Sequence, residues 1–406
     1  MLEQPPLGLY IHIPWCIRKC PYCDFNSHQA NGDIQERGYI TKLFDDFLYE
    51  YERLGDQARE LQSIFIGGGT PSLFSGESYK FLIQNIKQHI NFSENIEITI
   101  EANPGAVDSE QFRSYIEAGI NRLSIGAQSF NNKHLEKLGR IHSKEDTITA
   151  INIAKSVGFQ DLNVDLMHGL PGQSVESAIE DLKIAVDNAP THISWYQLTI
   201  EPNTYFYSYP PRLPEDVVLD TIHERGIEVL ENNGYSQYEV SAFSQTSKNS
   251  THNCNYWNFG DYIGIGAGAH GKLTMPIDNK LVRSKKLKQP NNYMNKVQSE
   301  VTQLNEILIE EANLFCEWYV KKNLPKNTKG EFTRKFKKII KKLASNLKLK
   351  NNVFVHRDFH VSNLMLVENQ IGVIDSQDAL IGNRAYHLTL IHISEPTRPL
   401  YIAYAV

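Results

Sequence analysis

Three cysteines lie within eight residues near the start of the chain, at positions 16, 20 and 23. They follow a short apolar run, Leu9–Ile13, and have the spacing Cys-x3-Cys-x2-Cys. Three thiolates on one tight loop can bind three irons of a cubane cluster, which leaves the fourth iron without a protein ligand. An open coordination position is a feature of catalytic and substrate-binding metal sites. The pattern therefore indicates a [4Fe–4S] cluster held by Cys16, Cys20 and Cys23.

A zinc site is the alternative explanation of these cysteines. It needs a fourth ligand nearby, and His12 and His28 are available, although their spacing differs from that of the usual zinc-binding pairs. The chain has five cysteines, at positions 16, 20, 23, 254 and 316, an odd number with three of them clustered. Because a disulfide framework would be spread more evenly, the clustering indicates metal-binding thiolates in a reducing compartment.

The composition is that of an ordinary globular protein, with 41% apolar and 22% charged residues. A formal net charge of −6 argues against a chain that binds nucleic acid over its whole length. No apolar run reaches the roughly 18 residues of a membrane span. The segment Met1–Pro6 lacks the basic and then apolar order of a signal peptide. We therefore expect a cytoplasmic protein.

Short β-rich runs alternate with longer amphipathic stretches in the first half of the chain. The predicted strands are Leu9–Ile13, Ser63–Ile66, Ile96–Ile100, Arg122–Ile125, Leu162–Leu166 and Ile193–Leu198. The predicted helices include Gly38–Leu54, Ser78–Ile90, Ser109–Ala118 and Ser174–Asn188. Repeated alternation of strand and helix is typical of parallel βαβ units. The sequence thus predicts an α/β fold whose parallel sheet curves into an incomplete TIM-like (β/α)6 barrel.

Glycine, proline and polar residues follow the predicted strands at corresponding positions. They occur in Gly67-Gly68-Gly69-Thr70-Pro71, Glu101-Ala102-Asn103-Pro104, Gly126-Ala127-Gln128, Asp165 with Gly169-Leu170-Pro171-Gly172, and Glu201-Pro202. In barrels of parallel strands, the loops at the carboxyl ends build the active site. Turns alone explain any one of these loops, but five in succession favour a shared site.

The cysteine loop, together with the triple glycine further along, resembles the radical S-adenosylmethionine (SAM) superfamily. In that superfamily the amino and carboxylate groups of SAM chelate the open iron, and electron transfer cleaves SAM to methionine and a 5′-deoxyadenosyl radical. The resemblance thus implies SAM as a second cofactor. A glycine-rich loop suits it, because glycine lets backbone groups approach a ligand without a Cβ atom.

Over about residues 5–298 the chain resembles the family of oxygen-independent coproporphyrinogen III oxidases and HemW-type heme chaperones. The matching stretches are Leu9–His28, Gly67–Ser72, Glu101–Gly105, Arg122–Phe130, Leu138–His142, Asn163–Gly172 and Gly264–Gly271. The resemblance implies that SAM contacts Tyr10, Tyr22, Gly68, Gly69, Thr70, Glu101, Gln128, Arg140 and Asp165. The guanidinium fork of Arg140 matches a carboxylate, with an ordinary surface arginine as the alternative, and Asp165 could hold ribose hydroxyls.

Two features separate the heme chaperones from the oxidases. The oxidases have a further cysteine two residues after the third, where this chain has Phe25. Residues His252-Asn253-Cys254-Asn255-Tyr256-Trp257 match the HNxxYW motif associated with heme binding. A histidine beside aromatic rings supplies the axial nitrogen and the flat surfaces that a heme pocket needs. A structural His-Asn loop is the alternative, and Cys254 is a second candidate ligand.

The resemblance implies a heme chaperone that binds a [4Fe–4S] cluster, SAM and heme, and that delivers heme to hemoproteins such as respiratory enzymes. Such a protein needs an electron donor for its cluster, could contact membranes through its recipients and could form a homodimer. A radical SAM decarboxylase of the coproporphyrinogen III oxidase type is the alternative. The sequence leaves open whether the chain is an enzyme.

The chain changes character after about Glu300. Residues 353–378 resemble the catalytic loop of aminoglycoside-phosphotransferase-like kinases, with Asp358 to accept a substrate proton, Asn363 five residues on, and Asp375 for magnesium. A glycine-rich nucleotide loop followed by a strand lysine is missing upstream, Ser376 replaces an aromatic residue, and His387 stands where the family has an aspartate. An ATP-dependent small-molecule kinase is thus a second alternative, and we predict that this fragment is inactive.

The remaining C-terminal residues add two expectations. Segment 321–350 holds twelve Lys and Arg and one acidic residue, which favours a solvated helix face over an RNA- or membrane-binding helix. Residues 390–398 look like a translated sequencing adapter. We therefore expect three parts: a radical SAM domain with the HNxxYW segment at 1–298, a mainly helical kinase-like fragment at 299–389, and a non-native tail at 390–406. A natural two-domain fusion is the alternative.

Overall fold

The computed structural model describes residues 4–30, 32, 34–55, 58–276, 280–297, 299–303, 330–339, 353–355, 364–367, 370–373 and 380–382. The chain divides into two units. The larger comprises Pro5–Lys272 with Ser284–Glu300, and the other comprises Met1–Gln4, Leu273–Arg283 and Val301–Val406. The candidate site lies in the larger unit.

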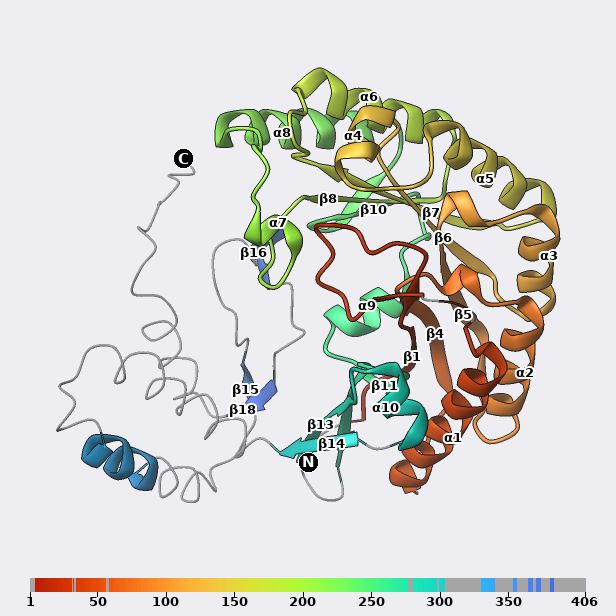
Figure 1. The fold of residues 1–406 in the computed structure, drawn as a ribbon, viewed down its shortest axis with the longest axis vertical. Helices are drawn as coiled ribbons and strands as arrows, with labels where there is room; N and C mark the ends of the chain where they lie inside the picture. Colours follow the sequence, from red (N-terminus) through yellow and green to blue (C-terminus); the bar gives the residue numbers. More distant parts are fainter. Residues whose placement is uncertain are drawn as a thin grey trace. The chain divides into compact units, whose positions relative to one another are not determined.

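Parallel strands form the centre of the larger unit (Figure 1). In spatial order they are β11 (Asp261–Ile265), β1 (Leu7–Ile13), β4 (Leu61–Gly68), β5 (Phe92–Ala102), β6 (Arg122–Gln128), β7 (Asp161–His168) and β8 (His192–Gln197). All six predicted strands are among them, which confirms the incomplete (β/α)6 barrel. The sequence did not predict β11, which pairs in parallel with β1. Beyond β8 the sheet continues through the antiparallel strands β10 (Ala242–Ser244) and β9 (Ser236–Glu239).

Helices lie along the outer face of the curved sheet (Figure 1). They are α1 (Glu36–Leu54), α2 (Gly76–Lys87), α3 (Ser109–Glu117), α4 (Asn132–Lys137), α5 (Lys144–Val157), α6 (Val175–Asp187) and α8 (Asp216–Asn232). In α6, Ala178, Leu182 and Ala185 are buried at the i, i+4, i+7 spacing of one helical face. Ser174 caps this helix by accepting a hydrogen bond from Ser177 N.

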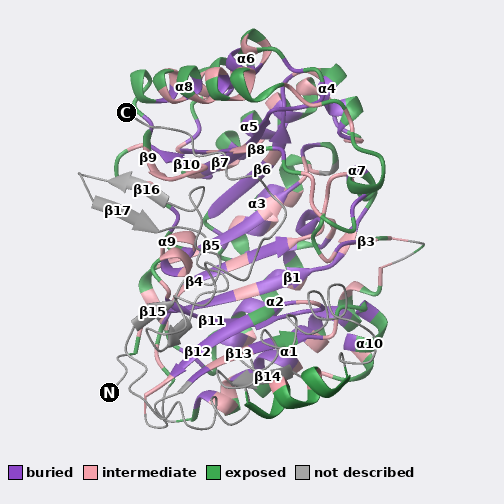
Figure 2. Ribbon diagram, turned by 90° about the vertical axis from the view of Figure 1, so that its left-hand side faces the viewer, coloured by how far each residue is buried: buried purple, intermediate pink, exposed green. Residues whose placement is uncertain are grey.

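Side chains alternate between the two faces of each strand, and this alternation shapes the interior. In β6, Leu123, Ile125 and Ala127 are fully buried. The intervening residues, Arg122, Ser124, Gly126 and Gln128, line a cavity inside the barrel. Because successive side chains point to opposite faces of a strand, the apolar set faces the helices and the polar set faces the interior. Figure 2 shows this central sheet as almost wholly buried.

Shorter elements complete the described residues up to Gln303. They are β2 (Trp15–Cys16), β3 (His28–Gln29), the 3-10 turns η2 (Pro71–Leu73) and η3 (Pro104–Ala106), α7 (Tyr205–Ser208), α9 (Thr251–Trp257), α10 (Pro290–Asn295), β12 (His270–Met275), β13 (Lys280–Lys286) and β14 (Ser299–Gln303). Of these, β2 and β3 carry the cysteine loop, while α9 carries the HNxxYW segment.

Beyond residue 303 the structure describes a helix at 330–339 and the strands β15 (Val353–Val355), β16 (Leu364–Val367), β17 (Gln370–Val373) and β18 (Leu380–Gly382). In the helix, Lys335 forms an ion pair with Glu331 at 2.7 Å. The kinase-like residues Asp358, Asn363 and Asp375, and the tail at 390–406, lie outside the described residues. Among the described helices, none combines the length and the apolar character needed to cross a membrane.

Candidate functional site

A cavity of about 350 Å3 lies at the carboxyl ends of the parallel strands, and we call it the carboxyl-end pocket. The three cysteines and eight of the nine residues expected to contact SAM line it: Cys16, Cys20, Cys23, Tyr22, Gly68, Gly69, Thr70, Glu101, Gln128, Arg140 and Asp165. They come from the cysteine loop, from the ends of four strands and from the segment after α4. Two expected site residues, Tyr10 and His252, do not line this pocket.

The cysteine loop is folded back on itself by backbone hydrogen bonds. Strands β2 and β3 pair in parallel, and Cys23 N donates to Cys20 O at 3.1 Å. All three cysteines are free thiols. Burial raises the pKa of Cys16 and of Cys23. A bound metal overrides such a shift, because a coordinating thiol is deprotonated outright. The loop therefore offers three soft ligands that fit an iron–sulfur cluster.

Cys20 also has a cationic neighbour. Arg140 Nη1 lies 3.7 Å from Cys20 Sγ, and Nη2 donates to Gly126 O at 2.8 Å. The Nε atom of the same guanidinium is buried without a hydrogen-bond partner among the described residues. Arg140 is thus a partly buried residue of the pocket with one donor unpaired among the described residues, and its role as a carboxylate clamp stays a prediction.

The zinc alternative loses one of its candidate ligands. Both ring nitrogens of His12 are in use: Nδ1 lies 2.9 Å from Tyr10 Oη, and Nε2 lies 3.0 Å from Asn26 O. Among the described residues, no group of three or more His, Cys, Asp or Glu side chains is arranged to hold a single metal ion. The same contact with His12 explains why Tyr10 is held away from the pocket.

The triple glycine brings β4 against the cysteine loop. A Cβ atom on Gly69 would lie 2.5 Å from Trp15 O, closer than any side chain can approach. Gly68 has a φ of 118°, which favours glycine, and its N–H donates to Glu101 Oε2 at 3.1 Å. These two positions therefore require glycine for packing against the cysteine loop, whatever they bind.

Two acidic side chains face the pocket, and both have raised pKa values. Burial, with the nearby charge of Asp165, raises the pKa of Glu101 to about 8. Burial also raises the pKa of Asp165, although it accepts hydrogen bonds from Ser124 Oγ at 2.8 Å and from Asn163 Nδ2 at 2.7 Å. A carboxyl group in this environment favours a cationic partner, because the added charge would stabilise its ionised form.

A chain of hydrogen bonds runs from Asp165 into the barrel. Asn163 Oδ1 lies 2.6 Å from His192 Nδ1, and His192 Nε2 lies 2.6 Å from Tyr238 Oη. Since Asn163 donates its amide hydrogens elsewhere, its oxygen accepts from His192, whose Nε2 then accepts from Tyr238. The Tyr238 oxygen in turn accepts from Ser250 N at 3.1 Å. This series of hydrogen bonds thus connects the pocket to Ser250, the residue that caps α9.

Gln128 has an unusual backbone at the end of β6. Its φ is 65°, in the left-handed region that non-glycine residues rarely occupy. Tyr196 Oη donates to Gln128 Oε1 at 2.6 Å and fixes the side chain. Strained residues of this kind are found at binding sites, where the surrounding structure compensates their cost of about 1–3 kcal/mol.

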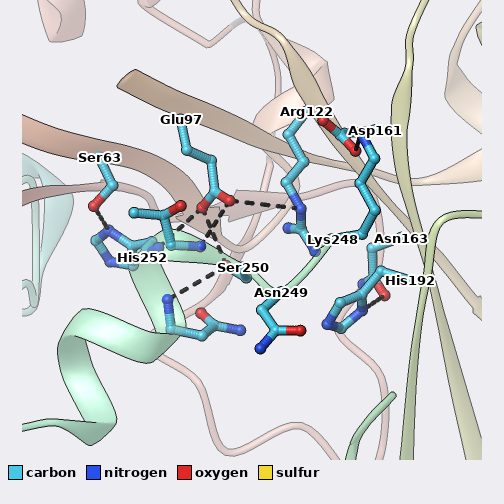
Figure 3. A network of polar contacts seen from close by, with 12 residues as sticks. Ser63, Glu97, Arg122, Asp161, Asn163, His192, Lys248, Asn249, Ser250 and His252 are labelled. Carbon is cyan, nitrogen blue, oxygen red and sulfur yellow. Dashed lines mark hydrogen bonds and ion pairs between the residues drawn. The ribbon is translucent and has the colours of Figure 1, made fainter. Parts of the chain in front are cut away.

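His252 lies at the opposite, amino-terminal ends of the strands. Its Nδ1 lies 2.9 Å from Ser63 Oγ, near the start of β4 (Figure 3). Its ring packs beside that of Phe65, with the ring centroids 5.2 Å apart. The side chain is 7% exposed, and burial lowers its pKa to about 3. From Gly8, which His252 faces, to the end of β1 is roughly 17 Å at the rise of a strand. The structure therefore separates the expected heme ligand from the cysteines by the length of the barrel.

A carboxylate on β5 binds the start of the helix that carries His252. Glu97, on β5, accepts hydrogen bonds from Ser250 Oγ at 3.1 Å, Thr251 N at 2.8 Å and His252 N at 3.0 Å (Figure 3). The two bonds from Thr251 N and His252 N satisfy N–H groups at the start of α9 that have no partner within the helix. Cys254, the second candidate heme ligand, is partly buried on the same helix.

Several pocket residues were not predicted from the sequence. They are Arg18, Phe25, Phe65, Arg122, Ser124, Asn163, Ser194, Tyr196 and Asn253. Two of them could have been predicted from the alternation of polar and apolar residues in β6, because this alternation places Arg122 and Ser124 on the same face as Gln128. Asn253 had no comparable signal, because its place depends on how α9 packs.

Comparison with known proteins identifies the family. Residues 10–185 match the radical SAM superfamily, and residues 298–405 match the phosphotransferase enzyme family. The chain is 52% identical over 316 residues to the heme chaperone HemW of Haemophilus influenzae. The aligned region covers 77% of this chain and 80% of the relative. The chain is also 49% identical over 294 residues to HemW of Escherichia coli, in an alignment that covers 72% and 77%. The chain belongs to the HemW family.

The fold of this HemW family member is also found in a solved structure. Coproporphyrinogen III oxidase (HemN) from Escherichia coli, a radical SAM enzyme, superposes with a TM-score of 0.65 at 19% identity, covering 92% of this chain and 87% of that one. At this identity the likeness supports the fold alone. Phe25, which stands where the sequence resemblance leads us to expect a further cysteine in the oxidases, is 63% exposed at the pocket.

Proposed function

We propose that the chain is a heme chaperone that holds a [4Fe–4S] cluster and SAM in the carboxyl-end pocket, binds heme and delivers it to hemoproteins such as respiratory enzymes. The observation that carries this proposal is that three free cysteines line one pocket with eight of the residues expected for SAM. It is supported by 52% identity to a protein named as a heme chaperone. A cytoplasmic location belongs to the same proposal.

The residues expected to bind the cluster and SAM each have a role under this proposal. Cys16, Cys20 and Cys23 would hold the cluster, which when bound supplies an open iron and an electron. Arg140 would attract a carboxylate through the guanidinium nitrogen that has no partner. Asp165 is held by Ser124 and Asn163 with its oxygens fixed, as a group that accepts ribose hydroxyls should be.

The backbone and the remaining side chains would shape the pocket around SAM. Gly68 and Gly69 let the end of β4 approach without side chains. With a pKa of about 8, Glu101 keeps its proton near neutral pH, and it would release that proton to solvent when a cationic ligand binds beside it. Gln128 and Tyr22 would complete the walls.

Heme binding is proposed from the HNxxYW segment and from the names of the relatives. Coordination by His252 requires the ring to leave Ser63 and α9 to move, since the side chain is 7% exposed. We propose His252 as the axial ligand, with Cys254 as the alternative on the same helix. An electron donor, contact with membrane-bound recipients and a homodimer are further parts of the proposal.

Heme titration of the reconstituted chain tests the assignment. The unaltered protein should bind heme stoichiometrically and transfer it to an apo-hemoprotein. The His252→Ala variant should lose the Soret spectrum of an imidazole complex, while Cys254→Ala should keep it. Unchanged affinity and spectrum in His252→Ala would remove His252 from the site. Robust decarboxylation of coproporphyrinogen III under reducing conditions would instead assign the chain to the oxidases.

We further propose that residues 299–389 are a phosphotransferase-like fragment joined to the radical SAM domain of residues 1–298, and that residues 390–406 are a non-native tail. The match of residues 298–405 to the phosphotransferase enzyme family supports the first part. Reading the genomic DNA across codons 295–310 and 388–406 tests both joins. A continuous natural reading frame would overturn the proposal in favour of a two-domain fusion.

A further inference from the structure

The floor of the carboxyl-end pocket contains a buried cation that none of the proposed roles uses. Arg122, the first residue of β6, is 5% exposed and lines the pocket. Its one ionic contact among the described residues joins Nε to Glu97 Oε2 at 3.9 Å, which is too long for a hydrogen bond (Figure 3). Within the same part of the chain its guanidinium makes no hydrogen bond, although it carries five donors.

Glu97 is a weak partner for this guanidinium because its oxygens are already occupied. They accept the three hydrogen bonds from the start of α9 at 2.8–3.1 Å. A buried charge is costly unless it is paired and hydrogen-bonded. The donors of Arg122 are therefore free to bind an anion that enters the pocket.

A second donor lies on the same floor. Asn253, on α9, also lines the pocket. Its backbone N–H donates to Ser250 Oγ at 3.3 Å, but its side-chain amide makes no hydrogen bond with any described residue. The neighbouring polar groups differ in this respect, since Ser124, Asn163 and Ser194 bond to one another or to Asp165. Among the described residues, the side chains of Arg122 and Asn253 thus take no part in the hydrogen-bond network of the interior.

These two residues lie deeper than the groups proposed for SAM. Along β6 the inward positions are Arg122, Ser124, Gly126 and Gln128, so Arg122 is roughly 20 Å from Gln128 along the strand. The ring of Phe65, which also lines the pocket, lies level with Arg122 by strand register, since Thr99 on β5 pairs with both residues. The pocket therefore has an upper part at the strand ends and a floor with different chemistry.

We propose that this floor is a subsite for the carboxylate of a small organic acid, bound by the guanidinium of Arg122 and the side-chain amide of Asn253. The proposal goes beyond the proposed function, which gives neither residue a role. A planar guanidinium fork matches the two oxygens of a carboxylate. Phe65 offers an apolar surface for the carbon skeleton of the acid.

The electrostatics of the pocket agree with an anionic ligand. Three arginines, Arg18, Arg122 and Arg140, line it against two carboxyl groups, Glu101 and Asp165. Burial raises the pKa of both acids, that of Glu101 to about 8. Near pH 7 the positive charges therefore outnumber the negative ones.

Saturation-transfer NMR on the purified full chain tests the subsite, with propionate and succinate as probes and propionamide as the neutral isostere. The two acids should receive saturation and propionamide should not. Arg122→Gln should weaken binding by about tenfold or more, because a charge-assisted hydrogen-bonded pair is lost. Arg225→Gln, an exposed arginine on α8, is the matched control and should have no effect.

Two further measurements keep each outcome decisive. Asn253→Asp places a negative charge beside the subsite and keeps Arg122 in the sequence. This variant should abolish acid binding, and it provides a test even if Arg122→Gln fails to fold. SAM binding to the reconstituted chain is measured in parallel. Acid binding without SAM binding would overturn the proposed function and leave the subsite standing. SAM binding with no acid bound, or acid binding unchanged in both variants, would overturn the subsite.

Discussion

Asn163 donates a hydrogen bond of 2.7 Å from Nδ2 to Oδ1 of Asp165, and it does so in an orientation that His192 fixes from the other side. Burial lowers the pKa of His192 well below its ordinary value, so the ring is neutral and has one donor and one acceptor nitrogen. The amide of Asn163 therefore has a single satisfied orientation, with its hydrogens toward Asp165. The carboxylate proposed for ribose is thus positioned by Asn163 and, through Asn163, by His192.

We expect Asn163→Ala to weaken SAM binding by about tenfold, since a hydrogen bond to a charged group contributes about 1.5–3 kcal/mol. Loss of the donor also raises the pKa of Asp165 further, so the pH below which SAM affinity falls should move upward. Tyr238→Phe, at the far end of the same chain, leaves both bonds to Asp165 intact and serves as the control. Equal affinity and an unchanged pH profile in Asn163→Ala would refute this positioning role.

Glu101 makes the stability of the SAM-free chain depend on pH. Its ordinary pKa is 4.5, and burial raises the value to about 8 in the folded state. Between these values the unfolded chain has lost the proton and the folded chain keeps it, so the free energy of unfolding falls as pH rises. In thermal unfolding, the melting temperature of the unaltered protein should decline from pH 5 to pH 9. The decline should be less steep in Glu101→Gln. Identical slopes in the two proteins would contradict the raised pKa.

Gly69→Ala should disrupt the cysteine loop. The new Cβ atom would lie 2.5 Å from Trp15 O, a backbone atom that cannot move without shifting the loop. Overpacking of this kind costs about 1–3 kcal/mol. The denaturant concentration at the midpoint of unfolding should decrease, and so should the iron content after reconstitution. Gly330→Ala, where a Cβ atom meets nothing within 4 Å, is the matched control and should change neither.

A buried ion cluster ties α1 to β13 within the larger unit. Lys286 is 4% exposed and binds Asp46 and Glu50, while Tyr293 Oη donates to Asp46 Oδ2 at 2.7 Å. Lys286→Met would leave the buried carboxylate of Asp46 without its cation, while Glu50 keeps its ion pair with Arg53 at 2.7 Å, and we expect a loss of about 3–5 kcal/mol in the free energy of unfolding. Lys42→Met removes the exposed pair with Asp45 and should cost less than about 1 kcal/mol. Equal urea midpoints for the two variants would contradict this account.

The sequence predicted the barrel well because its signals are local. Alternating apolar residues such as Leu123 and Ile125 mark each strand, and the residues at the strand ends follow within a few positions. It did not predict β11, because the parallel pairing of Ile263 with Leu9 joins residues far apart in the chain. The spacing of side chains within one segment carries no record of such a partner.

The position of the HNxxYW helix was unpredictable for the same reason. The type of residue at 252 suggested a ligand, but its burial arises from Ser63 and from the carboxylate of Glu97 on other strands. Arg122 was overlooked although it stood within a recognised stretch, because its importance lies in the hydrogen bonds that it does not make. Such features require the packed interior.

That the carboxyl-end pocket holds an open-iron cluster and SAM is tested most directly by electron paramagnetic resonance of the anaerobically reconstituted, reduced chain, with and without SAM. The spectrum should be that of a [4Fe–4S]+ cluster whose g-values shift when SAM is added. In Cys16→Ala, Cys20→Ala and Cys23→Ala the cluster signal should be lost. A cluster signal that SAM leaves unchanged, or one that survives the loss of these cysteines, would contradict the account.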